Sequence, residues 1–205
     1  ANHFFKKNDY DQALEIYKGA TKLWPSELNE KPDINYNLAE IYFSQEKYEK
    51  ARKHYFNFLN LDPTSKNAHK ALNKVGDTYL LEGNYQNALA VFDESSKKQI
   101  AKLDKEGKPI LDEEDNIILE DSADTQYGRI RMADIGIRSP RLKINDIVFN
   151  VSYYYKPFST YEKVSKEAKN IEILAEVSLS RGIAYLLEQN YLKAIEEFKK
   201  LFPLG

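Results

Sequence analysis

Small and large apolar residues alternate in a regular pattern along much of this chain. The clearest stretch runs from Leu72 to Phe92, where apolar positions recur at three- and four-residue intervals, as on one face of an α-helix. Gly83 and Asn84 interrupt this pattern, and such a pair is typical of a left-handed helix end followed by the N-cap of the next helix. The stretch is therefore predicted to be two short helices that pack against each other.

Two residues of this stretch are small where the helices are expected to cross. Antiparallel helices approach closely only where the facing side chains are small, so we expect Gly76 to lie against Ala88. The same order of small and aromatic residues returns elsewhere in the chain. The further copies are Ala39, Tyr42, Tyr48, Ala51 and Tyr55; Tyr10, Ala13, Tyr17 and Ala20; and Gly182, Tyr185, Tyr191, Ala194 and Phe198.

This pattern resembles the tetratricopeptide repeat family, whose unit of about 34 residues carries small and aromatic residues in this order. The resemblance implies an all-α fold, a right-handed α-solenoid of antiparallel helix pairs, with about four repeats over roughly two thirds of the chain. It also implies a concave face lined by the first helix of each repeat, and a function in binding other proteins.

The repeats divide the chain into three expected parts. Residues 1–99 are expected to hold three repeats, and Ala1 already matches a mid-helix small position, so we expect a truncated first repeat and a fragment of a longer protein. Residues 100–143 are expected to be a non-repeat insertion. Residues 144–205 are expected to hold a degenerate repeat, from about residue 145 to 170, and then a final repeat.

The insertion has its own pattern. Two short apolar runs, residues 108–111 and 116–119, are separated by the acidic residues 112–115, which predicts a β-hairpin with a polar turn. Residues 130–137 are expected to add a third strand or a bent helix. An isolated hairpin is only marginally stable in water, so this one is expected to pack on the repeats or on a partner.

Local signals predict several helix ends. Asp9 is expected to be an N-cap, with Gln12 completing a capping box, and Asn190 is expected to cap the last helix. Pro63 is expected to stop the second helix of its repeat, because proline cannot donate the backbone hydrogen bond that the next turn requires.

The concave face supplies the candidate binding site. A groove lined by successive first helices suits an extended peptide or a partner's helix. The alternative is that its polar residues are merely solvated. The expected partner-binding residues are Asn2, Tyr36, Asn37, Glu40, Lys70, Asn73, Lys74 and Asp77, with Asp33, Leu81, Glu176, Ser180 and Ile183 on the same face.

A narrower hypothesis concerns a chaperone adaptor. The chaperone-binding branch of the family holds a partner's C-terminal carboxylates with asparagine and basic side chains, and the resemblance assigns this role to Asn2, Asn37, Lys70 and Lys74. Ammonium and amide groups donate well to carboxylates, although lysine lacks arginine's bidentate geometry. Asparagine at both positions is also common in the wider family, so only the lysines favour this alternative.

The insertion also contains the strongest charge asymmetry. Residues 109–128 contain seven acidic residues and no lysine or arginine. Four of the chain's six arginines follow, and they are Arg129, Arg131, Arg138 and Arg141. They are expected either to face solvent and the acidic block, or to form a second protein interface.

Composition excludes several classes of function. The net charge of −2 and the lack of a reading motif argue against nucleic acid. The sequence contains no apolar run long enough for a transmembrane helix. It has no cysteine, no zinc-type histidine pair and no phosphate-binding glycine loop, so we expect no metal, no cofactor and no enzyme activity. Cytoplasm and periplasm both remain open.

We therefore expect a non-catalytic scaffold or adaptor that binds another protein and helps to assemble a multiprotein complex. The resemblance points to bacterial envelope, secretion or motility machines as settings. Self-association is a further expectation, because Leu201 and Phe202 are apolar residues at the end of the last repeat.

Overall fold

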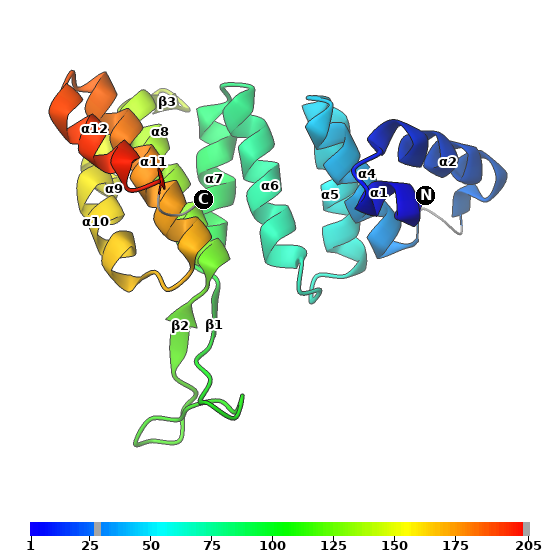
Figure 1. Ribbon diagram of the computed structural model, residues 1–205, viewed down its shortest axis with the longest axis horizontal. Helices are drawn as coiled ribbons and strands as arrows, with labels where there is room; N and C mark the ends of the chain where they lie inside the picture. The colour runs from blue at the N-terminus through cyan, green and yellow to red at the C-terminus, as the bar shows by residue number, and fades with distance from the viewer. Residues whose placement is uncertain (27–29, 203–205) are drawn as a thin grey trace. The chain divides into compact units, whose positions relative to one another are not determined.

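The computed structural model describes residues 1–26 and 30–202, which form two compact units, residues 1–88 and 89–205 (Figure 1). The expected first part, 1–99, and the expected last part, 144–205, each include residues outside the described ones. The division of the sequence into three parts remains a prediction, because repeats and compact units are different divisions of a chain.

The first unit is built from antiparallel helix pairs. Its helices are α1 (Asn2–Lys6), α2 (Tyr10–Leu23), α4 (Pro32–Ser44), α5 (Tyr48–Leu61), α6 (Ala68–Leu81) and the beginning of α7 (Tyr85–Ser96). Helix α2 packs on α1 and α4, and α5 packs between α4 and α6. Ala39 and Ala51, the small residues expected at one crossing, are fully buried, as are Tyr55 and Phe58.

Several predicted helix ends of this unit are confirmed. The side chain of Asp9 caps α2 by accepting a hydrogen bond from the backbone N–H of Gln12. Gly83 has a φ of +73°, the left-handed region that favours glycine, and the Asn84 side chain accepts the N–H of Asn87. Gly76 and Ala88 are both buried. Their mutual contact remains a prediction.

The second unit combines helices with two short strand pairs. It contains the rest of α7, then β1 (Gln99–Ala101), β2 (Leu119–Asp121), α8 (Ala123–Arg138), β3 (Arg141–Ile144), β4 (Ile147–Asn150), α9 (Val151–Tyr155), α10 (Pro157–Glu167), α11 (Ile171–Leu187) and α12 (Tyr191–Lys199). Helices α8, α10 and α11 pack on one another, and α12 packs on α11. Their core contains Ile130, Ala133, Tyr161, Val164, Ile173, Val177 and Ala184.

The last helix pair confirms the expected role of small residues. Gly182 in α11 lies against the ring of Phe198 in α12, so closely that a Cβ at Gly182 would lie 2.7 Å from Cδ1 of that ring. The side chain of Asn190 caps α12 by accepting the N–H of Lys193, as the sequence predicts. Glycine is therefore required here by close approach rather than by backbone conformation.

Two segments differ from the expected elements. Of the strand and the bent helix expected for residues 130–137, the helix is present but is longer: residues 123–138 form α8, capped by Ser122. Residues 141–150, which span the end of the expected insertion and the start of the expected degenerate repeat, form the antiparallel hairpin β3–β4. Its turn residues Asn145 and Asp146 have φ of 47° and 66°, as a two-residue hairpin turn requires, and asparagine and aspartate tolerate this conformation best after glycine.

The expected hairpin in the insertion is present, with a different strand pairing at its base. Strands β1 and β2 are antiparallel, with Ala101 opposite Leu119. Beyond them, the turn expected at 112–115 joins Leu111 and Ile117, which form a further antiparallel bridge. The fold is thus one of helix pairs, with one short strand pair in the expected insertion and a second where the insertion was expected to end.

Candidate functional site

A hollow of about 170 Å³ opens between α8 and α11 in the second unit. Helix α10 supplies one residue to its floor. The lining residues are Arg131, Asp134, Ile137, Arg138, Tyr161, Glu176, Leu179, Ser180, Ile183, Ala184 and Leu187. We call this feature the α8–α11 groove. Glu176, Ser180 and Ile183, which were expected on a concave face, line this groove. So do Arg131 and Arg138, which were expected in a separate interface.

The floor of the groove is a buried polar network centred on Asp134. The Tyr161 hydroxyl donates to Oδ1 of Asp134 at 2.7 Å, and the Ser180 hydroxyl donates to Oδ2 at 3.2 Å. Arg131 donates to the same Oδ2 at 2.7 Å and forms an ion pair with Glu176 at 2.6 Å. Burial raises the pKa of Tyr161, and the Asp134 carboxylate raises it further, so the phenol stays protonated and donates. These bonds hold the floor in one arrangement.

The rim of the groove is apolar with one exposed cation. Leu179 and Leu187 of α11 are 41% and 59% exposed and lie side by side with the hollow, so they add apolar surface to its rim. Arg138, the last residue of α8, is exposed on the opposite side. The groove therefore offers apolar surface and a guanidinium group within one recess.

The concave-face residues of the first unit mostly contact their own fold. Asn2 accepts a hydrogen bond from the Tyr17 hydroxyl at 2.5 Å, and Asn37 donates to that hydroxyl at 2.9 Å. Burial raises the pKa of Tyr17, while the Asn37 hydrogen bond lowers it and Asp33 raises it. The two asparagines of the proposed clamp are thus joined through one phenol, a contact that sequence spacing did not predict.

Glu40 and Tyr36 contact the buried rings of α5. Glu40 accepts a hydrogen bond from the Tyr55 hydroxyl at 2.5 Å, and burial, then Glu40, raises the pKa of Tyr55. The ring of Tyr36 packs edge-on against Phe58, with centroids 5.1 Å apart. These side chains therefore contribute to the stability of the helix pair, whatever else they contact.

The residues expected on α6 differ in exposure. Asn73 and Asp77 are buried, whereas Lys70 is exposed. Lys74 lies 3.8 Å from Asp77 and its ammonium lies 4.3 Å from the centre of the Phe43 ring. Both lysines can still contact a ligand. The carboxylate clamp of Asn2, Asn37, Lys70 and Lys74 remains a prediction.

The four arginines of the expected second interface lie at three places. Arg131 and Arg138 line the α8–α11 groove. Arg129 is paired with Asp121 at the end of β2, and Arg141 is exposed on β3. We expected these arginines in one interface because their spacing alone does not show that α8 is a helix with two faces.

The described residues form neither a metal site nor a membrane span. Among residues 1–26 and 30–202, no group of histidine, aspartate and glutamate side chains could hold a metal ion. Within the same ranges, no helix is long and apolar enough to cross a membrane.

A family model described as a tetratricopeptide repeat matches residues 4–75. Similar solved structures include MamA, with 18% identity, a TM-score of 0.51, and coverage of 98% of this chain and 92% of MamA. YrrB, described as a TPR protein with an unusual peptide-binding site, has 15% identity and a TM-score of 0.53, with coverage of 100% of this chain and 82% of YrrB. The apo form of RapI has 14% identity and a TM-score of 0.54, with coverage of 98% of this chain and 64% of RapI.

No protein with a curated description matches the sequence. The likeness to these solved structures is one of fold, while the family model matches the repeats of the first unit directly. Residues 4–75 therefore match the tetratricopeptide repeat family by sequence, and the chain shares its helix-pair fold with a known TPR protein.

Proposed function

We propose that this chain is a protein-interaction scaffold, which holds a peptide or a helix of a partner and so helps to assemble a multiprotein complex. The observation that carries the proposal is the α8–α11 groove, where exposed leucines and an exposed arginine border a hydrogen-bonded floor. The proposed action is reversible binding without catalysis.

The groove suits a ligand with an apolar side chain and a carboxylate. The apolar side chain would cover Leu179 and Leu187, which stabilises the complex by removing their surface from water. The carboxylate would pair with Arg138, whose planar guanidinium accommodates two carboxylate oxygens. Arg131 is already held by Asp134 and Glu176, so its role is to shape the floor.

The residues expected in the first unit are proposed as a second contact. Lys70 and the partly exposed Lys74 would contribute directly, while Asn2, Tyr36, Asn37, Glu40, Asn73 and Asp77 would maintain the surface around them. YrrB, of the same fold, is described as having a peptide-binding site, which supports a peptide as the ligand.

A peptide selection tests the proposal. A phage library of short random peptides is selected on the purified chain, and the affinities of the selected peptides are measured by fluorescence anisotropy. We expect them to combine leucine or phenylalanine with aspartate, glutamate or a free C-terminus. The variant Leu179→Ser with Leu187→Ser, and the variant Arg138→Ala, should each weaken binding about tenfold or more.

Leu23→Ser is the matched control, because Leu23 is an exposed leucine of the first unit. It should change the affinity less than about twofold. Selected peptides that bind both groove variants as well as the original chain would overturn the groove as the site. If Tyr36→Ala, Asn37→Ala and Lys74→Ala abolish their binding instead, the site lies in the first unit.

The alternative function is a chaperone adaptor that holds a partner's C-terminal carboxylate. The exposed position of Lys70 supports this alternative function, because its ammonium group can reach a ligand. Peptides with a free C-terminus would then bind more tightly than the same peptides with an amidated end, and Lys70→Ala with Lys74→Ala would abolish the difference. Equal affinity for both forms would remove the alternative.

For the wider assembly, we propose only the kind of complex and not its components. A bacterial envelope, secretion or motility complex is the setting that the family resemblance suggests. Affinity purification of the intact parent protein, followed by mass spectrometry, would identify its partners.

A further inference from the structure

The segment from residue 99 to 121, which we call the finger, contains an internal repeat. Residues 103–110 read LDKEGKPI and residues 111–118 read LDEEDNII, so leucine, aspartate, glutamate and isoleucine recur with a period of eight, and Leu119 begins a third copy. A period of eight belongs neither to a helix nor to a simple hairpin. It indicates a small structural unit of its own.

The structure shows what the period builds. Three equivalent bridges join three short segments: Leu103 pairs with Pro109, Leu111 with Ile117, and Leu119 with Ala101. The backbone bonds form a closed ring, in which Lys102 N–H donates to Ile118 C=O, Ile118 N–H to Ile110 C=O, and Ile110 N–H to Lys102 C=O. Each segment therefore pairs with the other two, around an approximate threefold axis.

The two turns of the finger are built alike. Oδ1 of Asp104 accepts the backbone N–H groups of Glu106 and Lys108 at 2.8 and 2.9 Å. Oδ1 of Asp112 accepts those of Glu114 and Asn116, both at 2.9 Å. Gly107 and Asp115 occupy the same place in their turns and both have positive φ, of 81° and 61°. The finger is thus held by specific bonds along its whole length.

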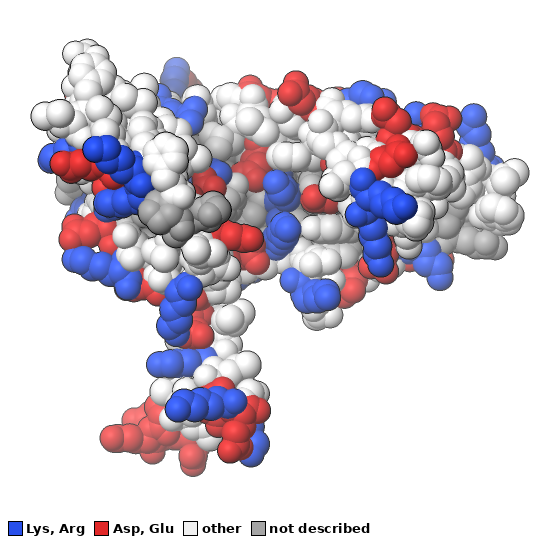
Figure 2. Space-filling model, viewed as in Figure 1, with Lys and Arg blue, Asp and Glu red and all other residues white. Residues whose placement is uncertain are grey.

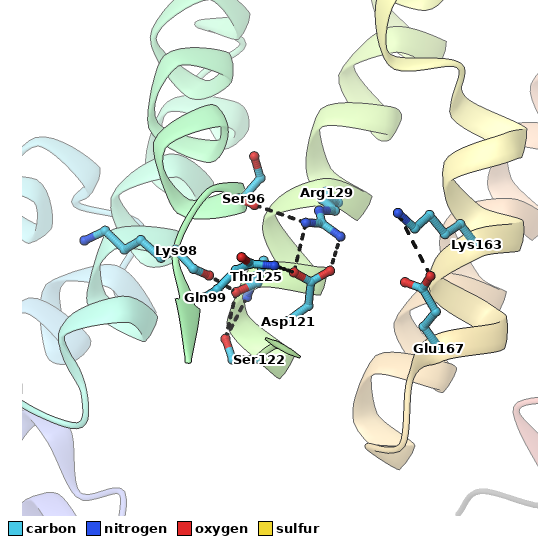
Figure 3. Close-up of polar contacts among 9 residues, drawn as sticks. All are labelled: Ser96, Lys98, Gln99, Asp121, Ser122, Thr125, Arg129, Lys163 and Glu167. Atoms are coloured by element: carbon cyan, nitrogen blue, oxygen red, sulfur yellow. Dashed lines mark hydrogen bonds and ion pairs between the residues drawn. The ribbon is translucent and has the colours of Figure 1, made fainter. Parts of the chain in front are cut away.

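Its base is fixed to α7 and α8 (Figure 3). Asp121 forms a bidentate ion pair with Arg129 and accepts a hydrogen bond from Gln99 at 2.9 Å. The Thr125 hydroxyl donates to the carbonyl of Lys98. Arg129, expected in a partner interface, therefore serves to orient the finger.

The finger projects from the helices of the second unit with its apolar side chains uncovered (Figure 1). Leu103, Leu111 and Leu119, the equivalent leucines of the three copies, are 53%, 48% and 55% exposed, and Ile100 and Ile117 are about as exposed. Its surface is strongly charged (Figure 2). Eight carboxylates and three lysines lie within residues 99–121, and the turn at 112–116 carries four of those carboxylates with no lysine.

We propose that the finger is a second docking surface, distinct from the α8–α11 groove, for a protein segment that presents lysine or arginine side chains next to apolar ones. Apolar surface on a rigid projection is typical of an interaction site. Charge complementarity identifies the partner as basic, since the carboxylates of the second turn would face its cations.

The closed backbone ring determines how that partner binds. At Lys102, Ile110 and Ile118 both the N–H and the C=O groups are already used, so an incoming strand finds no partners at this level. The proposed recognition therefore uses side chains at this level, with the leucines supplying contact area and the carboxylates supplying orientation. The negative charge of the finger also disfavours nucleic acid phosphates and anionic lipid.

The test uses the full chain and two short labelled peptides of the same length and leucine content, one with lysine and one with glutamate at its remaining positions. Binding is followed by fluorescence anisotropy. The lysine peptide should bind at least about tenfold more tightly than the glutamate peptide, and its affinity should fall as salt rises from about 0.05 to about 0.5 M.

Two finger variants should each weaken binding of the lysine peptide about tenfold. One is Leu103→Ser with Leu111→Ser and Leu119→Ser; the other is Glu113→Lys with Glu114→Lys, whose side chains lie outside the backbone ring. Each variant has a control outside the finger. Ile147→Ser with Val148→Ser replaces exposed apolar residues of β3–β4 by serine, and Glu49→Lys with Glu196→Lys reverses the charge of two exposed glutamates. They should change the affinity less than about twofold.

Slow amide exchange at Lys102, Ile110 and Ile118 would show that the finger stays folded in each variant. Equal losses in finger and control variants, or equal binding of both peptides, would overturn the proposal. Sedimentation velocity gives a further test. If the original chain self-associates and the leucine variant does not, the finger binds a second copy of the chain, and the proposal is overturned. Groove variants should leave this binding unchanged, which separates the test from that of the groove.

Discussion

Tyr161 and Asp134 form a contact that recurs in this fold: the tyrosine hydroxyl, from the second helix of a pair, donates to a polar side chain on the first. In the first unit Tyr17 of α2 donates to Asn2 of α1 in the same way, and Tyr55 of α5 donates to Glu40 of α4. The recurrence supports the interpretation that α8 and α10 are a helix pair of the repeat type, with β3, β4 and α9 inserted between them.

This contact makes the first prediction. Tyr161→Phe should lower the free energy of unfolding by about 1–3 kcal/mol, because a buried carboxylate loses one of its donors while the ring still fills the core. Urea unfolding followed by circular dichroism measures the change. Tyr154→Phe, at an exposed tyrosine, is the control and should stay within about 0.5 kcal/mol. A loss of equal size in both variants would contradict the role of the hydroxyl.

Two glycines give opposite predictions for the same substitution. Gly182→Ala should destabilise the chain by about 1–3 kcal/mol, because its methyl group would overlap the Phe198 ring. Gly19→Ala should stabilise it by about 0.5–1 kcal/mol, because nothing lies within 4 Å of a Cβ at this position in α2. Thermal unfolding of both variants measures the changes. Gly182→Ala combined with Phe198→Leu should recover part of the loss, and no recovery would argue against a clash with that ring.

His54 should make stability depend on pH. Burial lowers its pKa to about 4, with a smaller effect of Lys53, and its Nδ1 lies 3.1 Å from Oδ1 of Asn35. The unfolded chain, with a histidine pKa of about 6.5, therefore binds more protons between these two pKa values. The stabilisation is fully present above about pH 6.5 and is lost as the pH falls toward about 4.

We expect His54 to account for a loss of about 1 kcal/mol between about pH 7 and about pH 5, after discounting for its partial exposure. Urea titrations of the original chain and of His54→Gln would measure it as the difference between their pH slopes. His3→Gln, at an exposed histidine, is the control and should keep the original slope. Identical slopes for all three proteins would contradict the prediction.

Asp112 should titrate at an unusually low pH. Backbone N–H groups of Asn116 and Glu114 donate to its carboxylate and lower its pKa below the usual value for aspartate. The turn that it holds is therefore intact above that usual value and loosens as the pH falls through the lowered pKa. Carboxyl-carbon NMR would give a midpoint below about 3.9. In Asp112→Asn the amide oxygen still accepts these bonds, so the protection of the Asn116 amide, relative to its intrinsic exchange rate, should no longer fall in acid. A midpoint at or above the usual value would contradict the prediction.

Much of the helix-pair fold could be predicted because its determinants are local. Gly83 with Asn84, and Asp9 with Gln12, act within a few residues, so each helix end is encoded where it occurs. Gly182 could be identified as a crossing position because its spacing from Phe198 equals that in the other repeats.

The pair of α8 and α10 could not be found by spacing. Asn2 and Tyr17 are 15 residues apart, as are Glu40 and Tyr55, whereas Asp134 and Tyr161 are 27 apart. A search at a fixed period passes over a pair whose two helices are separated by a hairpin. The turn residues Asn145 and Asp146, between two alternating apolar runs, were the available signal for that hairpin.

Some residues that line the α8–α11 groove could be assigned to one surface from the regular spacing of the repeats, and others could not. Glu176, Ser180 and Ile183 were expected on a concave face because α11 belongs to a well-formed repeat. Arg131 and Arg138 were assigned to a separate surface, although they line the same groove, because α8 was not recognised as a first helix. The period of eight in the finger was readable in the sequence, but its closed pairing depends on three segments meeting in space.

The ring of main-chain bonds among Lys102, Ile110 and Ile118 also bears on solubility. A protruding ribbon rich in leucine would ordinarily recruit further ribbons and grow into fibrils. At these three residues the donors and acceptors that such polymerisation needs are satisfied within the projection itself. The finger can therefore display apolar side chains with fewer open backbone groups for a neighbouring ribbon to pair with.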